Sequence, residues 1–96
     1  MRSLEAQAAE AARMLRLLAN ESRLLVLCQL AAHRELSVGD LTRAADISPS
    51  ALSQHLARLR ADGLVATRRE AQTIHYRIAD PRVGRLLKSL KAIYCP

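Results

Sequence analysis

The segment 37–62 constrains the fold of this chain more than any other part of the sequence. Ser37 and Ser48 are predicted N-caps of two short helices, and Pro49 takes the first position of the second helix, where its missing N–H costs nothing. Gly63 is the expected stop of that helix, because glycine readily adopts the left-handed conformation that ends many helices. Two short helices joined by a tight turn predict a helix-turn-helix.

Two strand-like runs follow the helix-turn-helix and are predicted to form a β-wing over 64–79. The runs 64–69 and 73–78 alternate apolar and polar residues, which is the pattern of half-buried strands. Residues 70–72 are small or polar and are expected to form the turn. A helix-turn-helix followed directly by such a hairpin is typical of winged-helix DNA-binding domains.

The rest of the chain is predicted to be helical, so the expected fold is mainly α with a small β-wing, in the order ααααββα. The segments 4–18 and 81–94 carry apolar residues at helical spacing, and 22–32 is the expected central, buried helix because it is apolar over most of its circumference. A single domain, 1–96, of this size buries only roughly 60–65% of its unfolded surface. We therefore expect a homodimer through 4–18 and 81–94, whose apolar stripes need a partner copy.

The charge of the chain favours a polyanionic partner. The formal net charge is +6, and all but two of the 15 basic residues are arginines, whose planar guanidinium group suits phosphates and guanine edges. The chain has no Phe or Trp, and its only tyrosines are Tyr76 and Tyr94. Proteins that bind single strands or RNA usually stack bases on aromatic side chains. Double-stranded DNA is therefore the predicted partner.

One face of the second helix of the helix-turn-helix is small and polar, as a helix that enters the major groove must be. On this face Gln54 is suited to adenine and Arg58 to guanine or a phosphate. The wing and the helix N-terminus add further donors for the DNA backbone. The residues predicted to contact DNA are Ser48, Ser50, Ser53, Gln54, His55, Arg58, Arg68, Arg69, Gln72 and Thr73.

The sequence offers no chemistry of an enzyme and no signal for a membrane. It has no carboxylate pair, Ser/His/Asp set, Cys/His pair or phosphate-binding loop, so we expect no catalysis. It has neither an apolar run of about 20 residues nor a signal peptide at its start, so the expected location is the cytoplasm, where a permanent disulfide is not formed. Taken singly, Cys28 would be a buried core residue and Cys95 part of a frayed tail.

The stretch SPSALSQHLARLRADGLVATRREAQTIHYRI resembles the recognition helix and wing of the ArsR/SmtB family of winged-helix repressors. LLANESRLLVLCQL resembles the second helix of that family and ELSVGDL its third helix, so the resemblance covers essentially the whole chain. It implies a homodimer packed through its first and last helices, a palindromic operator, and release of that operator when an inducer binds.

The metal sites known in this family lack their ligands in this chain. One site uses a C-x-C pattern in the third helix, where this sequence has Ser37, Val38 and Gly39. Another starts with Asp and His at the beginning of the last helix, where Asp80 is followed by Pro81 and the helix contains neither His nor Glu. We expect no metal site and no cofactor, and keep a metal-responsive repressor as an alternative.

The two cysteines resemble the sensor of the BigR/SqrR branch of the family, the sulfide-responsive repressors. The matching sequences are RLLVLCQL around Cys28 and LKAIYC around Cys95. The resemblance implies that reactive sulfur species, the persulfides, link these thiols and thereby release the operator. Thiols held slightly too far apart for a disulfide can still close through extra sulfur atoms, each adding about 2 Å. The alternatives are a general thiol-redox repressor and, from another class, a dimerisation or interaction module that binds no DNA.

Overall fold

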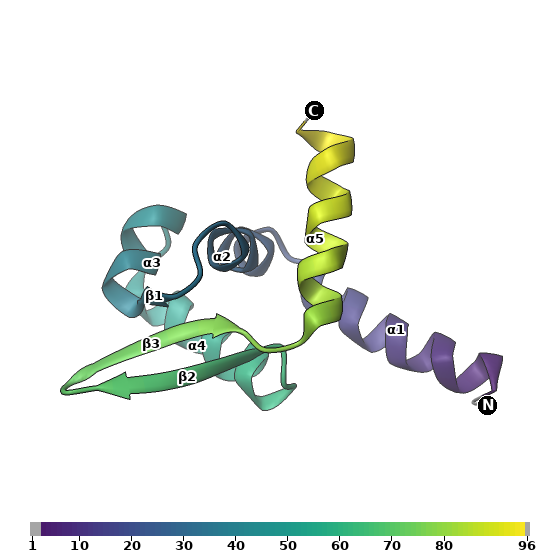
Figure 1. Cartoon of the computed structure of the whole chain (residues 1–96), viewed down its shortest axis with the longest axis horizontal. Helices are drawn as coiled ribbons and strands as arrows, with labels where there is room; N and C mark the ends of the chain where they lie inside the picture. Colours follow the sequence, from purple (N-terminus) through teal and green to yellow (C-terminus); the bar gives the residue numbers. More distant parts are fainter. Residues whose placement is uncertain (1–2, 96) are drawn as a thin grey trace.

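The computed structural model describes residues 3–95 and confirms a mainly α fold with a small β-wing (Figure 1). Its elements are α1 (Leu4–Leu18), α2 (Glu21–Ala32), β1 (Leu36–Ser37), α3 (Val38–Ala45), α4 (Pro49–Ala61), β2 (Val65–Glu70), β3 (Thr73–Ile78) and α5 (Pro81–Tyr94). The helix-turn-helix is made by α3 and α4, and the wing by β2 and β3. In the part of the chain that is described, no helix is both long and apolar enough to cross a membrane.

The helices begin where the capping residues predict. Asn20 caps α2, Ser48 caps α4 and Asp80 caps α5, each by accepting a hydrogen bond from a backbone N–H in the first turn. Ser37 and Asp40 form a reciprocal capping box at the start of α3. These local interactions set the residue at which each helix begins.

The chain reverses direction at residues with positive φ. Gly63, at φ 77°, leads from the end of α4 into β2, as predicted. Ala71, at φ 56°, forms the hairpin turn together with Gln72. Glu70 pairs with Thr73 in the sheet, so the turn is one residue shorter than the predicted 70–72. The sequence predicts Glu70 in the turn because a glutamate at the end of an alternating run has the polarity of a turn residue.

A third strand, β1, was not predicted from the sequence. The strand order is β1-β3-β2 with antiparallel neighbours, and β1 pairs Leu36 with Tyr76 and Ser37 with His75. Two residues are too few to show the alternation that identifies a strand. β1 joins the base of the hairpin to the body, while the distal part of the hairpin projects alone (Figure 1).

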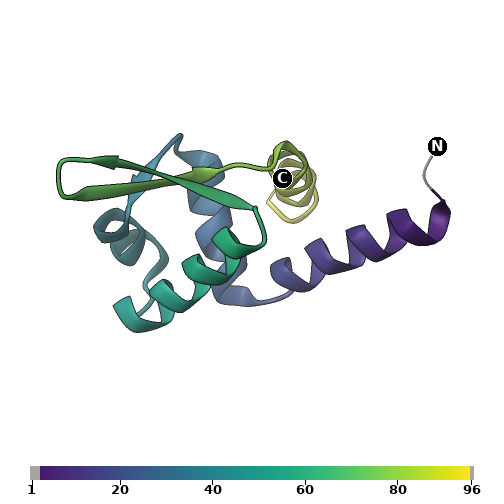
Figure 2. The same cartoon turned by 90° about the horizontal axis from the view of Figure 1, so that it is seen from below.

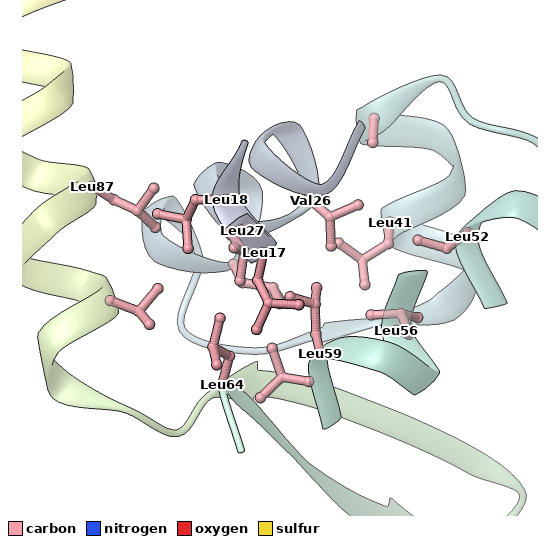
Figure 3. Packing of buried hydrophobic residues seen from close by; sticks show 14 residues of the cluster. Leu17, Leu18, Val26, Leu27, Leu41, Leu52, Leu56, Leu59, Leu64 and Leu87 are labelled. Carbon is pink, nitrogen blue, oxygen red and sulfur yellow. The ribbon is translucent and has the colours of Figure 1, made fainter. Parts of the chain in front are cut away.

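A leucine-rich core holds α2, α3, α4 and the base of the wing together. Its side chains interdigitate between these helices (Figure 3). Tyr76 and Ile78 of β3 pack against this core from one face of the sheet. The buried hydrophobic residues are Leu17, Leu18, Val26, Leu27, Leu30, Leu41, Ala45, Leu52, Leu56, Leu59, Leu64, Val65, Val83 and Leu87.

α2 is central but not buried all round, which corrects the expectation from its composition. Val26, Leu27 and Leu30 are buried, whereas Leu25 and Cys28 are exposed. The hypothesis that Cys28 is a core residue is therefore wrong for this protomer. The sequence misled because apolar residues surround the helix, and composition alone does not tell a core face from a face that awaits a partner.

α1 and α5 extend away from the body (Figures 1 and 2), and both keep large apolar side chains exposed. In α1 only Leu17 and Leu18 are buried, while Leu4 is 79% exposed. At the end of α5, Ile93 is 68% and Tyr94 77% exposed. These two helices have the ranges predicted for dimerisation, and that role stays a prediction.

Arg23 fixes the direction in which α1 leaves the body. Its side chain is only 8% exposed, and its Nε donates a 2.7 Å hydrogen bond to the carbonyl oxygen of Leu17. Its Nη2 donates to the carbonyl oxygen of Arg16 at 3.3 Å. The last carbonyls of a helix have no partner inside it, so a buried guanidinium satisfies them and matches the negative end of the helix dipole.

We expect Arg23→Met to lower the free energy of unfolding by about 1–3 kcal/mol, because the change leaves buried carbonyl groups without a donor. Urea denaturation followed by circular dichroism measures this. Arg16→Met is the matched control, because the Arg16 side chain is exposed, and it should change the unfolding free energy little. Equal effects of the two substitutions would contradict this role of Arg23.

Candidate DNA-binding surface and thiol pair

The outward face of α4 is the centre of the candidate DNA-binding surface. Leu52, Leu56 and Leu59 are buried at i, i+4 and i+7, which turns the opposite side of the helix to solvent. The exposed positions on and beside that opposite side are Ser50, Ser53, Gln54, Ala57, Arg58, Arg60 and Ala61. This face is small and polar, and Figure 2 shows α4 (teal) lying next to the hairpin (green).

Two predicted contact residues, Ser48 just before α4 and His55 within it, are respectively bonded and partly covered inside the protein. The Ser48 hydroxyl caps the helix by accepting a hydrogen bond from the N–H of Ala51 at 3.2 Å. His55 is half-buried at the edge of the exposed face. Burial lowers the pKa of His55, and the charges of Arg23 and Arg58 lower it further, so the imidazole is neutral at neutral pH. Contact of these residues with DNA stays a prediction.

The register of the hairpin sends its two predicted DNA-contacting arginines to opposite faces. Arg69 pairs with Ile74, on the face that also carries Tyr76 and packs on the core, whereas Arg68 pairs with His75 on the outer face. Arg69 is exposed, and its Nε donates to the carbonyl oxygen of Ala71 in the turn at 3.3 Å. Arg69 is therefore the wing arginine on the side of α4.

Arg68 is held by two carboxylates. Its Nη2 lies 2.6 Å from Oε1 of Glu35, and its Nη1 lies 2.7 Å from Oε2 of Glu70. The hydrogen bonds to Glu35 and then to Glu70 raise the pKa of Arg68 and lower the pKa of each carboxyl group. Gln72 and Thr73 are exposed at the tip of the hairpin, where the prediction placed them.

A groove of about 470 Å³ separates α4 from the wing. Val38 and Leu56 contribute to its lining, together with Ser53, Arg60 and Tyr76. Arg60 has no carboxylate partner among the described residues, so its charge is available to a ligand. The sequence interpretation missed this arginine, although its position seven residues after Ser53 places both side chains on one flank of the helix.

Cys28 on α2 and Cys95 at the end of α5 form a pair of free, exposed thiols. Partial burial raises the pKa of the Cys28 thiol, the charge of Cys95 raises it further, and the ammonium group of Lys91 lowers it. The helices α2 and α5, which carry these two thiols, contact each other in the fold. Within residues 3–95, no cluster of three or more His, Cys, Asp and Glu side chains could hold a metal ion.

Comparison with known proteins places this surface in a family. Residues 20–67 match the model of the bacterial regulatory proteins of the arsR family. The chain is 46% identical over 95 residues to the transcriptional activator HlyU of Vibrio cholerae. The alignment covers 99% of this chain and 87% of HlyU. It is 45% identical over 93 residues to the biofilm growth-associated repressor of Agrobacterium fabrum, covering 97% of this chain and 79% of the repressor.

Solved structures agree with this assignment. The structure described as reduced HlyU from Vibrio cholerae superposes with a TM-score of 0.92 over the whole of both chains, at 46% identity. The transcriptional repressor BigR from Xylella fastidiosa superposes with a TM-score of 0.90 at 36% identity, over 97% of this chain and 94% of BigR. The protein therefore belongs to the arsR family of bacterial regulatory proteins and is a DNA-binding transcriptional regulator of the ArsR type.

Proposed function

We propose that the protein is a homodimeric repressor that releases its operator when persulfides bridge Cys28 and Cys95. In this proposal α4 enters the major groove, and the hairpin meets the flanking backbone or minor groove. The observation that carries the sensing function is that two free, exposed thiols lie on α2 and at the end of α5, two helices that contact each other. The name of the Agrobacterium relative supports a repressor, whereas that of HlyU describes an activator.

The exposed apolar side chains of the end helices support a homodimer. Leu4 and Leu15 of α1 and Ile93 and Tyr94 of α5 are large hydrophobic residues that are at least half exposed. An unpaired stripe of this kind on a small domain favours association with a second copy. A two-fold dimer places two α4 helices at a fixed spacing, which suits a palindromic operator.

The chemistry of the bridge is balanced with persulfide as the only oxidant. A thiolate attacks the outer sulfur of a persulfide RSSH, gains one sulfur as Cys–SSH and releases RSH. A second RSSH extends this to Cys–SSSH, and the other cysteine then attacks its middle sulfur and expels H₂S. In sum, two thiols and two RSSH give one trisulfide, two RSH and one H₂S. The thiols are oxidised, and one sulfane sulfur is reduced to H₂S.

The bridge can act on the DNA-binding surface through α2. The same helix carries Cys28 on its outer side and, in its first turn, Arg23, which is bonded to the end of α1. Leu27 of α2 and Leu56 of α4 belong to the same buried core, so α2 and the recognition helix are packed into one body. Tying α2 to α5 therefore strains the elements that set the spacing of two α4 helices. A small change in this spacing lowers operator affinity.

Arg58→Ala and Arg60→Ala are each expected to weaken binding to duplex DNA. If each arginine contacts a phosphate, each change should reduce the slope of log affinity against log salt by about 0.9 per contact. Fluorescence anisotropy of a labelled duplex over a salt series measures this slope. Arg85→Ala, an exposed arginine on α5, is the matched control and should leave the slope unchanged. Unchanged affinity in both α4 variants would place the DNA contact elsewhere.

The sensing proposal is tested by the intact mass of the non-reduced protein after separate treatment with glutathione persulfide and with hydrogen peroxide. Persulfide alone should give a species that is heavier by one or two sulfurs and lighter by two hydrogens, with Cys28 linked to Cys95. A plain loss of two hydrogens with peroxide would indicate a general thiol-redox switch. Cys28→Ser and Cys95→Ser should bind DNA and fail to respond, and loss of DNA binding in either would make that cysteine structural.

The raised pKa of Cys28 predicts how its reactivity depends on pH. Only the thiolate reacts, so alkylation of Cys28 by iodoacetamide should keep accelerating above the pH at which an ordinary thiol levels off. Cys95→Ser removes a group that raises the pKa of Cys28 and should accelerate alkylation, whereas Lys91→Gln removes a group that lowers this pKa and should slow it. Peptide mass spectrometry follows the rate, with Lys88→Gln as the control. Identical rates in all variants would contradict the proximity of these groups.

A further inference from the structure

We propose that Glu35 is a positioning residue for DNA binding, because its ion pair with Arg68 holds the hairpin at the angle at which Arg69 and the hairpin tip meet the duplex. The inference rests on the proposed binding mode, in which the wing contacts DNA. It gives an acidic residue a favourable role in binding a polyanion, which is the reverse of what its charge alone would do.

The ion pair spans the full width of the sheet. Glu35 directly precedes β1, Arg68 lies in β2, and the strand order β1-β3-β2 places β3 between them. The Glu35 carboxylate accepts hydrogen bonds from Nε of Arg68 at 3.1 and 3.2 Å and from Nη2 at 2.6 Å. This two-pronged arrangement uses the planar fork of the guanidinium and fixes orientation as well as distance. The pair therefore holds the outermost strand of the wing to the body.

The pair acts at the base of the projecting part of the hairpin. β1 supports β3 only at Tyr76 and His75, and His75 is also the residue paired with Arg68. Beyond this level, from Arg69 to Ile74, the hairpin continues without a third strand. A small rotation at the level of Arg68 therefore becomes a larger displacement of Arg69 and the tip.

The surroundings of the ion pair keep the Glu35 carboxylate ionised. Glu35 and Arg68 line an open cavity of about 660 Å³ together with Arg34, Thr67 and Arg77. Glu35 therefore lies among cations. Its hydrogen bond to Arg68 lowers its pKa, so the carboxylate stays ionised at neutral pH. Replacing it with a neutral residue makes this side of the wing more positive.

A purely electrostatic role and a positioning role of Glu35 predict opposite changes in DNA affinity when Glu35 is replaced by a neutral residue. Removing a negative charge from a DNA-binding domain raises its affinity for the duplex if charge alone decides. Removing a positioning residue lowers the affinity, because the wing arginine and the tip lose their alignment. The sign of the change therefore separates the two roles.

The chain offers a matched control in Glu70. Glu35 and Glu70 both pair with Arg68, but Glu70 belongs to the same strand as Arg68 and cannot hold that strand to the body. We expect Glu35→Gln to weaken binding to a labelled mixed-sequence duplex severalfold and to reduce the salt slope. Glu70→Gln should leave binding equal or tighter. Both variants should melt at nearly the wild-type temperature, because exposed ion pairs contribute little to stability.

A double-mutant cycle completes the test. In an Arg68→Ala background, Glu35→Gln should no longer weaken binding, since Glu35 acts through Arg68. Tighter binding by Glu35→Gln in the wild-type background, or equal effects of Glu35→Gln and Glu70→Gln, would overturn the proposal. Arg69→Ala separates this from failure of the binding mode: if Arg69→Ala leaves affinity and salt slope unchanged, the wing does not contact DNA and the underlying mode is wrong. If Arg69→Ala weakens binding while Glu35→Gln tightens it, only the positioning role fails.

Discussion

The burial of the leucine face of α4 is the interaction on which the rest of the structure depends. Leu52, Leu56 and Leu59 are at most 2% exposed and fill the space between α4 and the helices behind it (Figure 3). Because the three leucines recur at helical spacing, their burial forces the small, polar side of α4 into solvent. The core continues through Leu64 and Val65, so the same packing that orients α4 also fixes where the wing begins.

α2 is the element that connects the separate parts of the protein. Its inner side supplies Leu27 to the core, its first turn supplies Arg23 to the end of α1, and its outer side presents the exposed thiol of Cys28. A single helix thus packs in the core, contacts α1 and carries one thiol of the pair. A displacement of α2 caused by a chemical change at Cys28 is passed to α4, because both helices pack in the same core.

Most of the fold was predictable because its signals are local. Caps such as Ser37 and Ser48, the stop at Gly63 and the spacing of the α4 leucines are all written within a few residues of where they act. What was missed depends on contacts between distant segments. β1 is a strand only because β3 lies beside it, and the outer face of α2 is exposed although it is apolar.

The candidate site follows the same division. The polar face of α4 was predictable from the helical repeat, whereas Arg68 reads as a free wing cation until Glu35, 33 residues away, is seen to bind it. The role of Arg60 was not predictable because it depends on the groove that Arg60 lines together with Tyr76. No local sequence pattern reveals this groove. Charge partners and grooves are products of tertiary structure, and a single sequence does not encode them in any short repeat.

The projecting α1 has a consequence for the lifetime of the protein. Leu4 and Leu15 lie in solvent, and only the last turn of α1 is buried in the protomer. A helix that is buried only at its last turn, and otherwise tied to α5 by the Glu10–Arg82 ion pair, opens more readily than a packed one and becomes a substrate for proteases. In a dimer of the proposed kind the arm is covered, so an unpaired protomer is removed faster than a paired one. The cellular level of such a regulator would then rise steeply above the concentration at which copies pair, because degradation slows as soon as enough copies exist to pair.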